Sequence, residues 1–115
     1  MKVIFETEDR DGVSVKLNGP QWKHITLGHP EMEEAMEAIR LTVEDPDVVA
    51  RTSIRPRDPD GERRVAARLG THPRYRGLWV WVPIEYCPTG NWVTTAYLSP
   101  LPPEGDLLYV RLPSR

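Results

Sequence analysis

The alternation of hydrophobic and polar residues predicts two strands at the beginning of the chain. Residues 2–7 contain three consecutive β-forming side chains, and the turn signal Asp-Arg-Asp-Gly follows at 9–12. Over residues 13–17 apolar side chains then alternate with polar ones, as they do in a half-buried strand. We expect the two strands to form an N-terminal β-hairpin.

Two helices are predicted after this hairpin. A short helix is expected over 20–27, where Gly28 closes it, and a longer one over 30–44. The longer helix carries one apolar stripe at helical spacing, made of Met32, Ala35, Met36, Ile39 and Val43. Pro30 suits its first position, and Pro46 ends it because the residue before a proline avoids the helical region.

From residue 48 onward the hydrophobic period changes to two, which is typical of strands. Strands are expected over 48–54, 64–69, 78–86, 92–99 and 107–112. Proline donates no ladder hydrogen bond, so Pro83 argues against a central position in the sheet for the strand over 78–86. The fold class that follows is α+β: an N-terminal hairpin, two helices, then a mainly antiparallel sheet of four to five strands with the helices on one face.

Length and composition narrow the class of protein. The 115 residues include 39% hydrophobic side chains and a single cysteine. We therefore expect a single domain over 1–115, with neither an internal disulfide nor a zinc site built on several cysteines. One cysteine suits a reducing compartment, so a cytoplasmic location is expected. There is neither an apolar run of about 18 residues nor a signal-peptide pattern, so no membrane association is expected.

The charge is distributed unevenly along the chain. The formal net charge is -2, yet residues 51–76 hold eight Arg and only three acidic residues. Arginine grips phosphate with two hydrogen bonds and stacks on bases. The candidate phosphate-binding side chains are Arg51, Arg63, Arg64, Arg74 and Arg76. The alternative is a solvated segment that balances the acidic first half of the chain.

Three short motifs occur together in this chain. They are His-Ile-x-x-x-His-Pro-Glu-Met at 24–32, Asp-Pro-Asp at 45–47 and Val-x-Thr-Ala-Tyr at 93–97. In this combination the chain resembles the phage and bacterial barnase–EndoU–colicin–RelE-like (BECR) nuclease domains. The resemblance covers roughly residues 22–110 and places the BECR-like core within 18–112.

The resemblance implies a metal-independent endoribonuclease of toxin type that uses no cofactor. Carried over by motif, His24 and His29 match the two histidines, and Thr95 and Tyr97 match the Thr-Ala-Tyr strand. The implied partners are RNA and either an antitoxin or a second copy of the chain.

The chemistry of metal-independent RNA cleavage fits these residue types. The ribose 2′-hydroxyl attacks the neighbouring phosphate, so one group must take its proton and another must protonate the leaving 5′ oxygen. Histidine suits both roles near neutral pH, and arginine suits the extra charge on the phosphorane. Thr95 or Tyr97 can hold a non-bridging oxygen. Because His24 and His29 are five residues apart, they do not share a helix face as i,i+4 metal ligands do.

Other interpretations of the same residues remain open. His24 can be a half-buried structural histidine, His29 a helix N-cap, Thr95 an ordinary strand residue and Tyr97 a core side chain. His72, in a loop beside Pro73, is expected to be exposed. A non-catalytic RNA- or protein-binding module is the main alternative function, because Gly28 stands where such sequences often carry a basic residue. A third is an interaction protein that dimerises through Trp79, Trp81 and Trp92.

Overall fold

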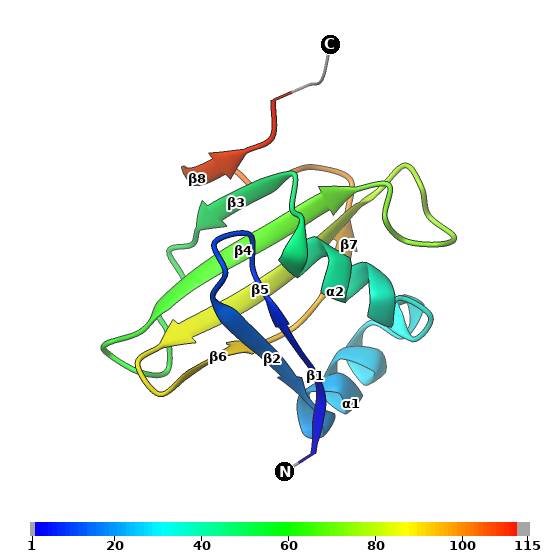
Figure 1. Cartoon of the computed structure of the whole chain (residues 1–115). Coiled ribbons are helices and arrows are strands. Elements are labelled where there is room, and N and C mark those ends of the chain that lie inside the picture. Colours follow the sequence, from blue (N-terminus) through cyan, green and yellow to red (C-terminus); the bar gives the residue numbers. More distant parts are fainter. Residues whose placement is uncertain (1, 113–115) are drawn as a thin grey trace.

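The computed structural model describes residues 2–112, and within them an N-terminal hairpin is followed by helices and then by further strands (Figure 1). The hairpin consists of β1 (Val3–Glu8) and β2 (Ser14–Asn18). The helices are α1 (Gly19–Gly28), the short 3-10 helix η1 (Pro30–Met32) and α2 (Met36–Glu44). The remaining strands are β3 (Val48–Arg51), β4 (Glu62–Leu69), β5 (Trp79–Cys87), β6 (Gly90–Val93), β7 (Tyr97–Ser99) and β8 (Asp106–Val110).

All these strands belong to one mixed sheet, in the order β1-β2-β6-β5-β4-β3-β8, with β7 paired to β5. The β2–β6 pair is parallel, through Lys16 and Trp92, and the other pairs are antiparallel. The α+β class is therefore confirmed, but the prediction of four to five strands was wrong, because the described residues form eight. The hairpin joins the sheet through β2, and the expected strand over 92–99 is divided into β6 and β7.

Pro83 lies in the middle of β5, which is a central strand, contrary to the expectation from sequence. The proline is tolerated because β5 changes partner beside it. Residues 79–81 pair with β7 and residues 84–87 pair with β6, so no regular ladder runs past Pro83 on that side. Its carbonyl accepts the backbone N–H of Thr94 at 3.0 Å on the same side. The missing N–H of proline therefore faces the irregular segment between β6 and β7 and breaks no ladder bond.

The helix predicted over 30–44 is interrupted. Only η1 and α2 are helical, and Ala35 lies between them in a non-helical conformation. The Ala35 N–H donates to Met32 O, three residues back, and the Glu31 carbonyl accepts instead from the ring of His72 at 2.6 Å. Met32 and Ala35 are both buried by this arrangement. A tertiary contact thus replaces one helical hydrogen bond, so the helix predicted from the apolar stripe alone was too long.

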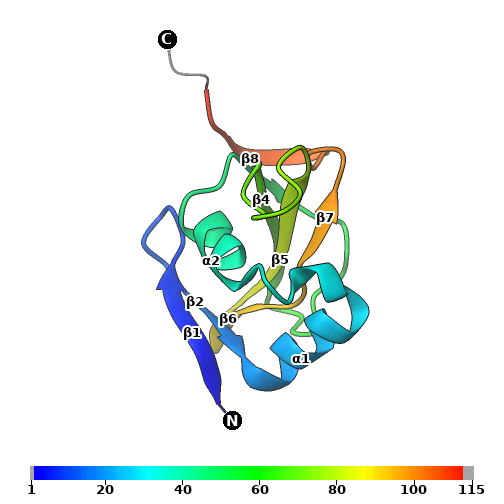
Figure 2. The same ribbon diagram turned by 90° about the vertical axis from the view of Figure 1, so that its right-hand side faces the viewer.

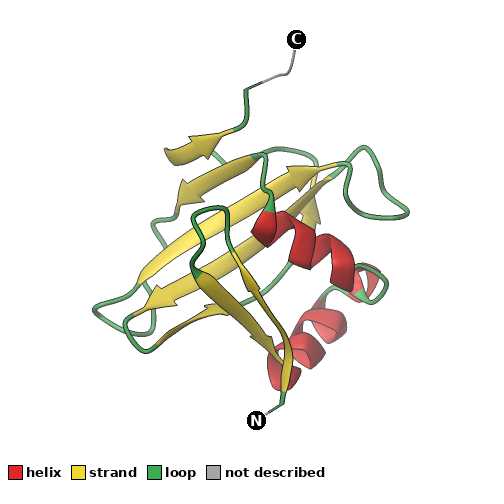
Figure 3. Cartoon of the chain, viewed as in Figure 1, coloured by secondary structure: helices red, strands yellow, loops and turns green. Residues whose placement is uncertain are grey.

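The helices cover one face of the sheet (Figure 3). In Figure 2, α2 lies between the β1–β2 hairpin and strands β4 and β5. It packs closely against β1, β4 and β5. The core between these layers contains Ile25 and Ile39 from the helices and Val80, Val82 and Ile84 from β5. The opposite face of the sheet, which we call the open face, is not covered by any helix of residues 2–112. No helix within residues 2–112 is long and apolar enough to cross a membrane.

Candidate functional site

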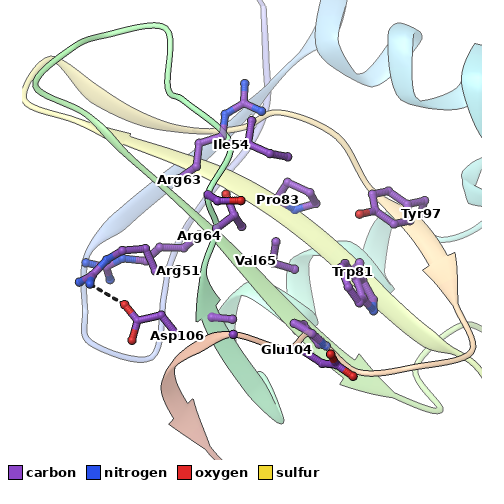
Figure 4. Close-up of a pocket in the computed structure, with 15 residues that line it drawn as sticks. Arg51, Ile54, Arg63, Arg64, Val65, Trp81, Pro83, Tyr97, Glu104 and Asp106 are labelled. Carbon is purple, nitrogen blue, oxygen red and sulfur yellow. Dashed lines mark hydrogen bonds and ion pairs between the residues drawn. The ribbon is translucent and has the colours of Figure 1, made fainter.

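A pocket of about 490 Å³ lies on the open face (Figure 4). Strands β3, β4, β5 and β7 and the loops around residues 52–54 and 103–106 provide its lining: Ala50, Arg51, Thr52, Ser53, Ile54, Arg63, Arg64, Val65, Trp81, Pro83, Tyr97, Pro103, Glu104, Gly105 and Asp106. Its volume lies within the range of small-ligand sites, and its lining is mostly apolar with a few polar groups, as is typical of such sites.

Strand register explains which side chains reach this face. Val80 and Val82 of β5 point into the core, so Trp81 and Pro83 point to the opposite side. Tyr97 is the direct cross-strand partner of Trp81, and it shares that side. On the other flank Val65 pairs with Pro83. The period-two pattern of β5 therefore builds the pocket floor.

Loops form the pocket walls. The indole Nε1 of Trp81 donates to the carbonyl of Leu101 at 2.8 Å, which anchors the loop before β8 against the aromatic side. Pro103 of that loop is buried. Opposite, the backbone N–H of Arg57 donates to Glu85 Oε1 at 2.9 Å and anchors the loop between β3 and β4. The pocket is therefore bounded by two segments tied to β5.

Three aromatic rings stand in series, running from Trp81 and Tyr97 of the pocket lining to His29, which lies outside the lining. The ring centroids of His29 and Tyr97 are 5.5 Å apart, and those of Tyr97 and Trp81 are 5.7 Å apart. Figure 4 shows the Tyr97 hydroxyl directed toward Pro83. Burial raises the pKa of Tyr97, so its phenol stays protonated at neutral pH. The His29 side chain is 40% exposed, and its Nδ1 lies 3.7 Å from Glu31 Oε1. An accessible imidazole therefore lies beside the phenolic proton donor Tyr97, outside the residues that line the pocket.

Arg63 lies across the pocket from these rings, beyond Pro83 in Figure 4. Its Nε is 3.3 Å from Glu85 Oε1, and the two side chains are only 20% and 13% exposed. Burial acts to raise the pKa of Glu85, but the Arg57 N–H and the Arg63 guanidinium together hold it below its usual value. Among residues 2–112, the Nη atoms of Arg63 have no hydrogen-bond partner. The guanidinium is thus held in place with donors left for a ligand.

The other arginines of the 51–76 segment are mostly engaged. Arg51 bridges Glu62 and Asp106 at 2.8 and 2.7 Å. Arg64 also pairs with Glu62, and its guanidinium lies 4.6 Å from the ring centroid of Tyr86. A further pair joins Arg74 to Glu34 at 2.9 Å, while Arg76 is exposed in the loop between β4 and β5. Arg51, Arg63 and Arg64 line the pocket, whereas Arg74 and Arg76 do not.

Of the four residues expected to be catalytic, Tyr97 lines the pocket, whereas His24, His29 and Thr95 lie outside its lining. His24 is exposed on α1, next in sequence to the buried Ile25. Thr95 is half-buried in the irregular segment between β6 and β7, two residues before Tyr97. The structure therefore places the His29 ring against that of Tyr97 and leaves His24 exposed on α1. His29 does occupy the N-cap position of η1, as the alternative interpretation expected, but its side chain makes no capping hydrogen bond.

His72 is fully buried, so the expectation that it is exposed was wrong. Its ring is enclosed between η1 and the loop that joins β4 to β5. The part of the chain that the structure describes holds no group of three or more His, Cys, Asp or Glu side chains arranged for a metal ion. For Cys87, burial and the neighbouring Glu85 raise the pKa of the thiol, which makes it a weak nucleophile.

Sequence reasoning did not assign Glu85, Pro83 or the 100–105 loop to a site. The alternation of β5 could have pointed to the first two, since residues 81, 83 and 85 must share the face opposite the core. The loop carried no such signal, because its position depends on one hydrogen bond to Trp81.

Comparisons of the chain with known protein families, with curated proteins and with solved structures found no match. The site is therefore interpreted from its own residues.

Proposed function

We propose that the open-face pocket binds RNA and that the protein is a metal-independent endoribonuclease of BECR type. The observation that carries the proposal is the arrangement of three groups around one pocket: the phenol of Tyr97 and the guanidinium of Arg63 line it from opposite sides, and the accessible imidazole of His29, outside the lining, rests on Tyr97. The short motifs that motivated a nuclease from sequence supply two of these three groups.

Each group has a role in the reaction. His29, when neutral, accepts the proton of the 2′-hydroxyl as the 2′ oxygen attacks phosphorus. The bond from phosphorus to the 5′ oxygen breaks, and Tyr97 gives that oxygen its proton. Arg63 stabilises the charge on the phosphorane through its free donors. The products are a 2′,3′-cyclic phosphate and a 5′-hydroxyl. A proton then passes through solvent from the His29 imidazole to the Tyr97 phenolate, which returns both side chains to their starting protonation states.

The aromatic and apolar lining suits an unpaired base. Single-stranded RNA is recognised mainly by stacking of splayed bases on aromatic side chains, and Trp81 and Tyr97 provide two such rings. Thr95 remains a proposed contributor through its hydroxyl, close to Tyr97 in the chain. A cytoplasmic location would give the enzyme access to its substrate.

The test is incubation of the purified protein with total RNA in EDTA, followed by analysis of the RNA ends. We expect His29→Ala to lower the cleavage rate by about 10²- to 10⁴-fold, as loss of a general base does. His24→Ala is the matched control, since it removes an exposed histidine of the same motif, and we expect its rate to stay within about threefold of the wild type. Equal rates for wild type and His29→Ala would refute the assignment, and a large loss in His24→Ala would return that residue to the site.

A second candidate function is a binding module without catalysis. The observation that favours it is that His29 lies outside the pocket lining, so the pocket itself presents no imidazole to a bound RNA. Equal RNA affinity of the wild type and His29→Ala, with no cleavage by either protein, would support this function. An inhibitory partner or a second copy that covers the open face would occupy the same pocket; a strictly monomeric mass at high concentration would exclude the second copy.

A further inference from the structure

His72 is a buried histidine that the proposed chemistry does not use. The residue is fully inaccessible to solvent and lies three residues after Leu69, the last residue of β4. Its Nε2 is 2.6 Å from the carbonyl oxygen of Glu31, which belongs to η1. Its Nδ1 is 3.0 Å from the backbone nitrogen of Arg74 and 3.3 Å from that of Tyr75. The ring therefore joins two segments about 40 residues apart in the chain.

The hydrogen-bond network assigns the tautomer of this ring. A carbonyl oxygen can only accept, so Nε2 must carry the proton and donate to Glu31. Backbone nitrogens can only donate, so Nδ1 must be the unprotonated acceptor. The ring is consequently neutral, and a second proton at Nδ1 would remove the acceptor for both amides.

The bond to Glu31 affects the course of the chain at His29. Because the Glu31 carbonyl is turned to His72, it does not accept from Ala35, whose N–H goes to Met32. The turn at residues 29–32 therefore stays separate from α2. His29 is the first residue of this turn, lies beside the Glu31 carboxylate and rests on Tyr97. A short path of contacts thus runs from His72 through Glu31 to the His29–Tyr97 pair.

We propose that His72 is a positioning residue that holds the 29–32 turn so that the His29 imidazole stays against Tyr97. The consequence for RNA cleavage rests on the proposed function, whereas the consequence for the His29 ring does not. A second tie joins the same segments, between Arg74 and Glu34, but those side chains are 67% and 42% exposed. Exposed ion pairs contribute little, so the buried ring dominates the link.

Two substitutions of His72 separate its two hydrogen-bonding roles. In His72→Asn the side-chain oxygen occupies the place of Nδ1 and retains the acceptor for Arg74, while the link to Glu31 is lost. In His72→Gln the amide nitrogen reaches the place of Nε2 and retains the donor to Glu31. His72→Asn therefore removes the hydrogen bond to Glu31 and leaves the turn at Arg74 in place. Arg74→Gln is the control, because it removes only the exposed ion pair with Glu34.

The first readout needs no RNA. In the wild type, ¹⁵N NMR is expected to show His72 as the neutral Nε2–H tautomer. The His29 ring protons are expected to carry a ring-current shift from Tyr97 that His72→Asn loses and that His72→Gln and Arg74→Gln keep. Far-UV circular dichroism and urea unfolding of each variant establish that it is folded. An Nδ1–H tautomer, or unchanged His29 signals in a folded His72→Asn protein, would overturn the proposal.

The second readout is catalysis. If the wild type cleaves RNA, His72→Asn should lower kcat by up to about 100-fold with little change in KM, because displacement of a catalytic group by about 1 Å has that effect. His72→Gln should recover most of this loss. A His72→Asn enzyme with wild-type kcat would refute the positioning role. If the wild type cleaves nothing, the proposed function fails, and the NMR result still decides whether His72 positions His29.

Discussion

At the scale of single residues, Glu85 shows how burial and charge compete. Its side chain is only 13% exposed, which favours the neutral acid, but the Arg57 N–H and the Arg63 guanidinium favour the carboxylate more. The net result is a pKa below the usual value. This carboxylate holds both the pocket arginine and the loop between β3 and β4.

The lowered pKa of Glu85 predicts how stability depends on pH. Below the usual glutamate pKa the unfolded chain binds a proton that the folded chain resists, so Glu85 stabilises the fold above about pH 4.5 and this contribution is lost as pH falls through the folded pKa. We expect the Glu85→Gln protein to have a lower urea midpoint than the wild type near neutral pH. On acidification, the Glu85→Gln protein should lose less stability than the wild type does. Parallel pH profiles for the two proteins would contradict this.

Tyr86 links a single side chain to the N-terminal hairpin. Its hydroxyl donates to Asp9 Oδ2 at 2.8 Å, and burial together with this acceptor raises its pKa. We expect Tyr86→Phe to cost about 1 kcal/mol of unfolding free energy, the usual contribution of one hydrogen bond, measured by urea denaturation. Tyr75→Phe is the control at an exposed tyrosine, for which no such loss is expected. A Tyr86→Phe protein as stable as the wild type would show that the bond contributes nothing.

At the scale of elements, the start of α1 was predictable and the course of the next helix was not. Asn18 caps α1, since its Oδ1 accepts the Gln21 N–H at 2.7 Å, and Pro20 occupies an early position where no N–H is needed. These are local interactions. The break between η1 and α2 depends on His72, which is distant in sequence, so the local pattern could not reveal it.

The Asn18 cap of α1 predicts how substitutions of Asn18 change the free energy of unfolding. Asn18→Ala leaves the Gln21 N–H without its acceptor, and we expect a loss of about 1 kcal/mol in the free energy of unfolding. Asn18→Asp keeps a side-chain acceptor at the same position and should retain most of the stability. Urea denaturation of the three proteins measures the difference, and equal losses in both variants would argue against capping.

At the scale of the whole molecule, ion pairs neutralise most of the charge asymmetry. The basic segment 51–76 is folded against acidic side chains from other parts of the chain, among them Glu34, Glu85 and Asp106. The segment is therefore not a continuous cationic surface. This arrangement limits how many phosphates the protein can neutralise at once.

The charge arrangement predicts a shallow salt dependence for RNA binding. If only Arg63 and one further cation contact phosphates, the slope of log K against log salt concentration should be about -1 to -1.5, at about -0.7 per phosphate on a single strand. Fluorescence anisotropy with a labelled RNA and His29→Ala protein, which avoids cleavage, measures this slope. A slope steeper than about -4 would mean that the carboxylate pairs open on binding and that the 51–76 arginines act together.

The sequence by itself determined the elements whose signals are local. The hairpin, α1 and the alternation of β5 all arise from interactions between neighbouring residues. The tertiary structure alone decided the eight-stranded pairing, the partner change that tolerates Pro83, the burial of His72 and the contact of His29 with Tyr97. Those features join residues far apart in the chain, so their free energies arise from packing and hydrogen bonds that no local pattern contains.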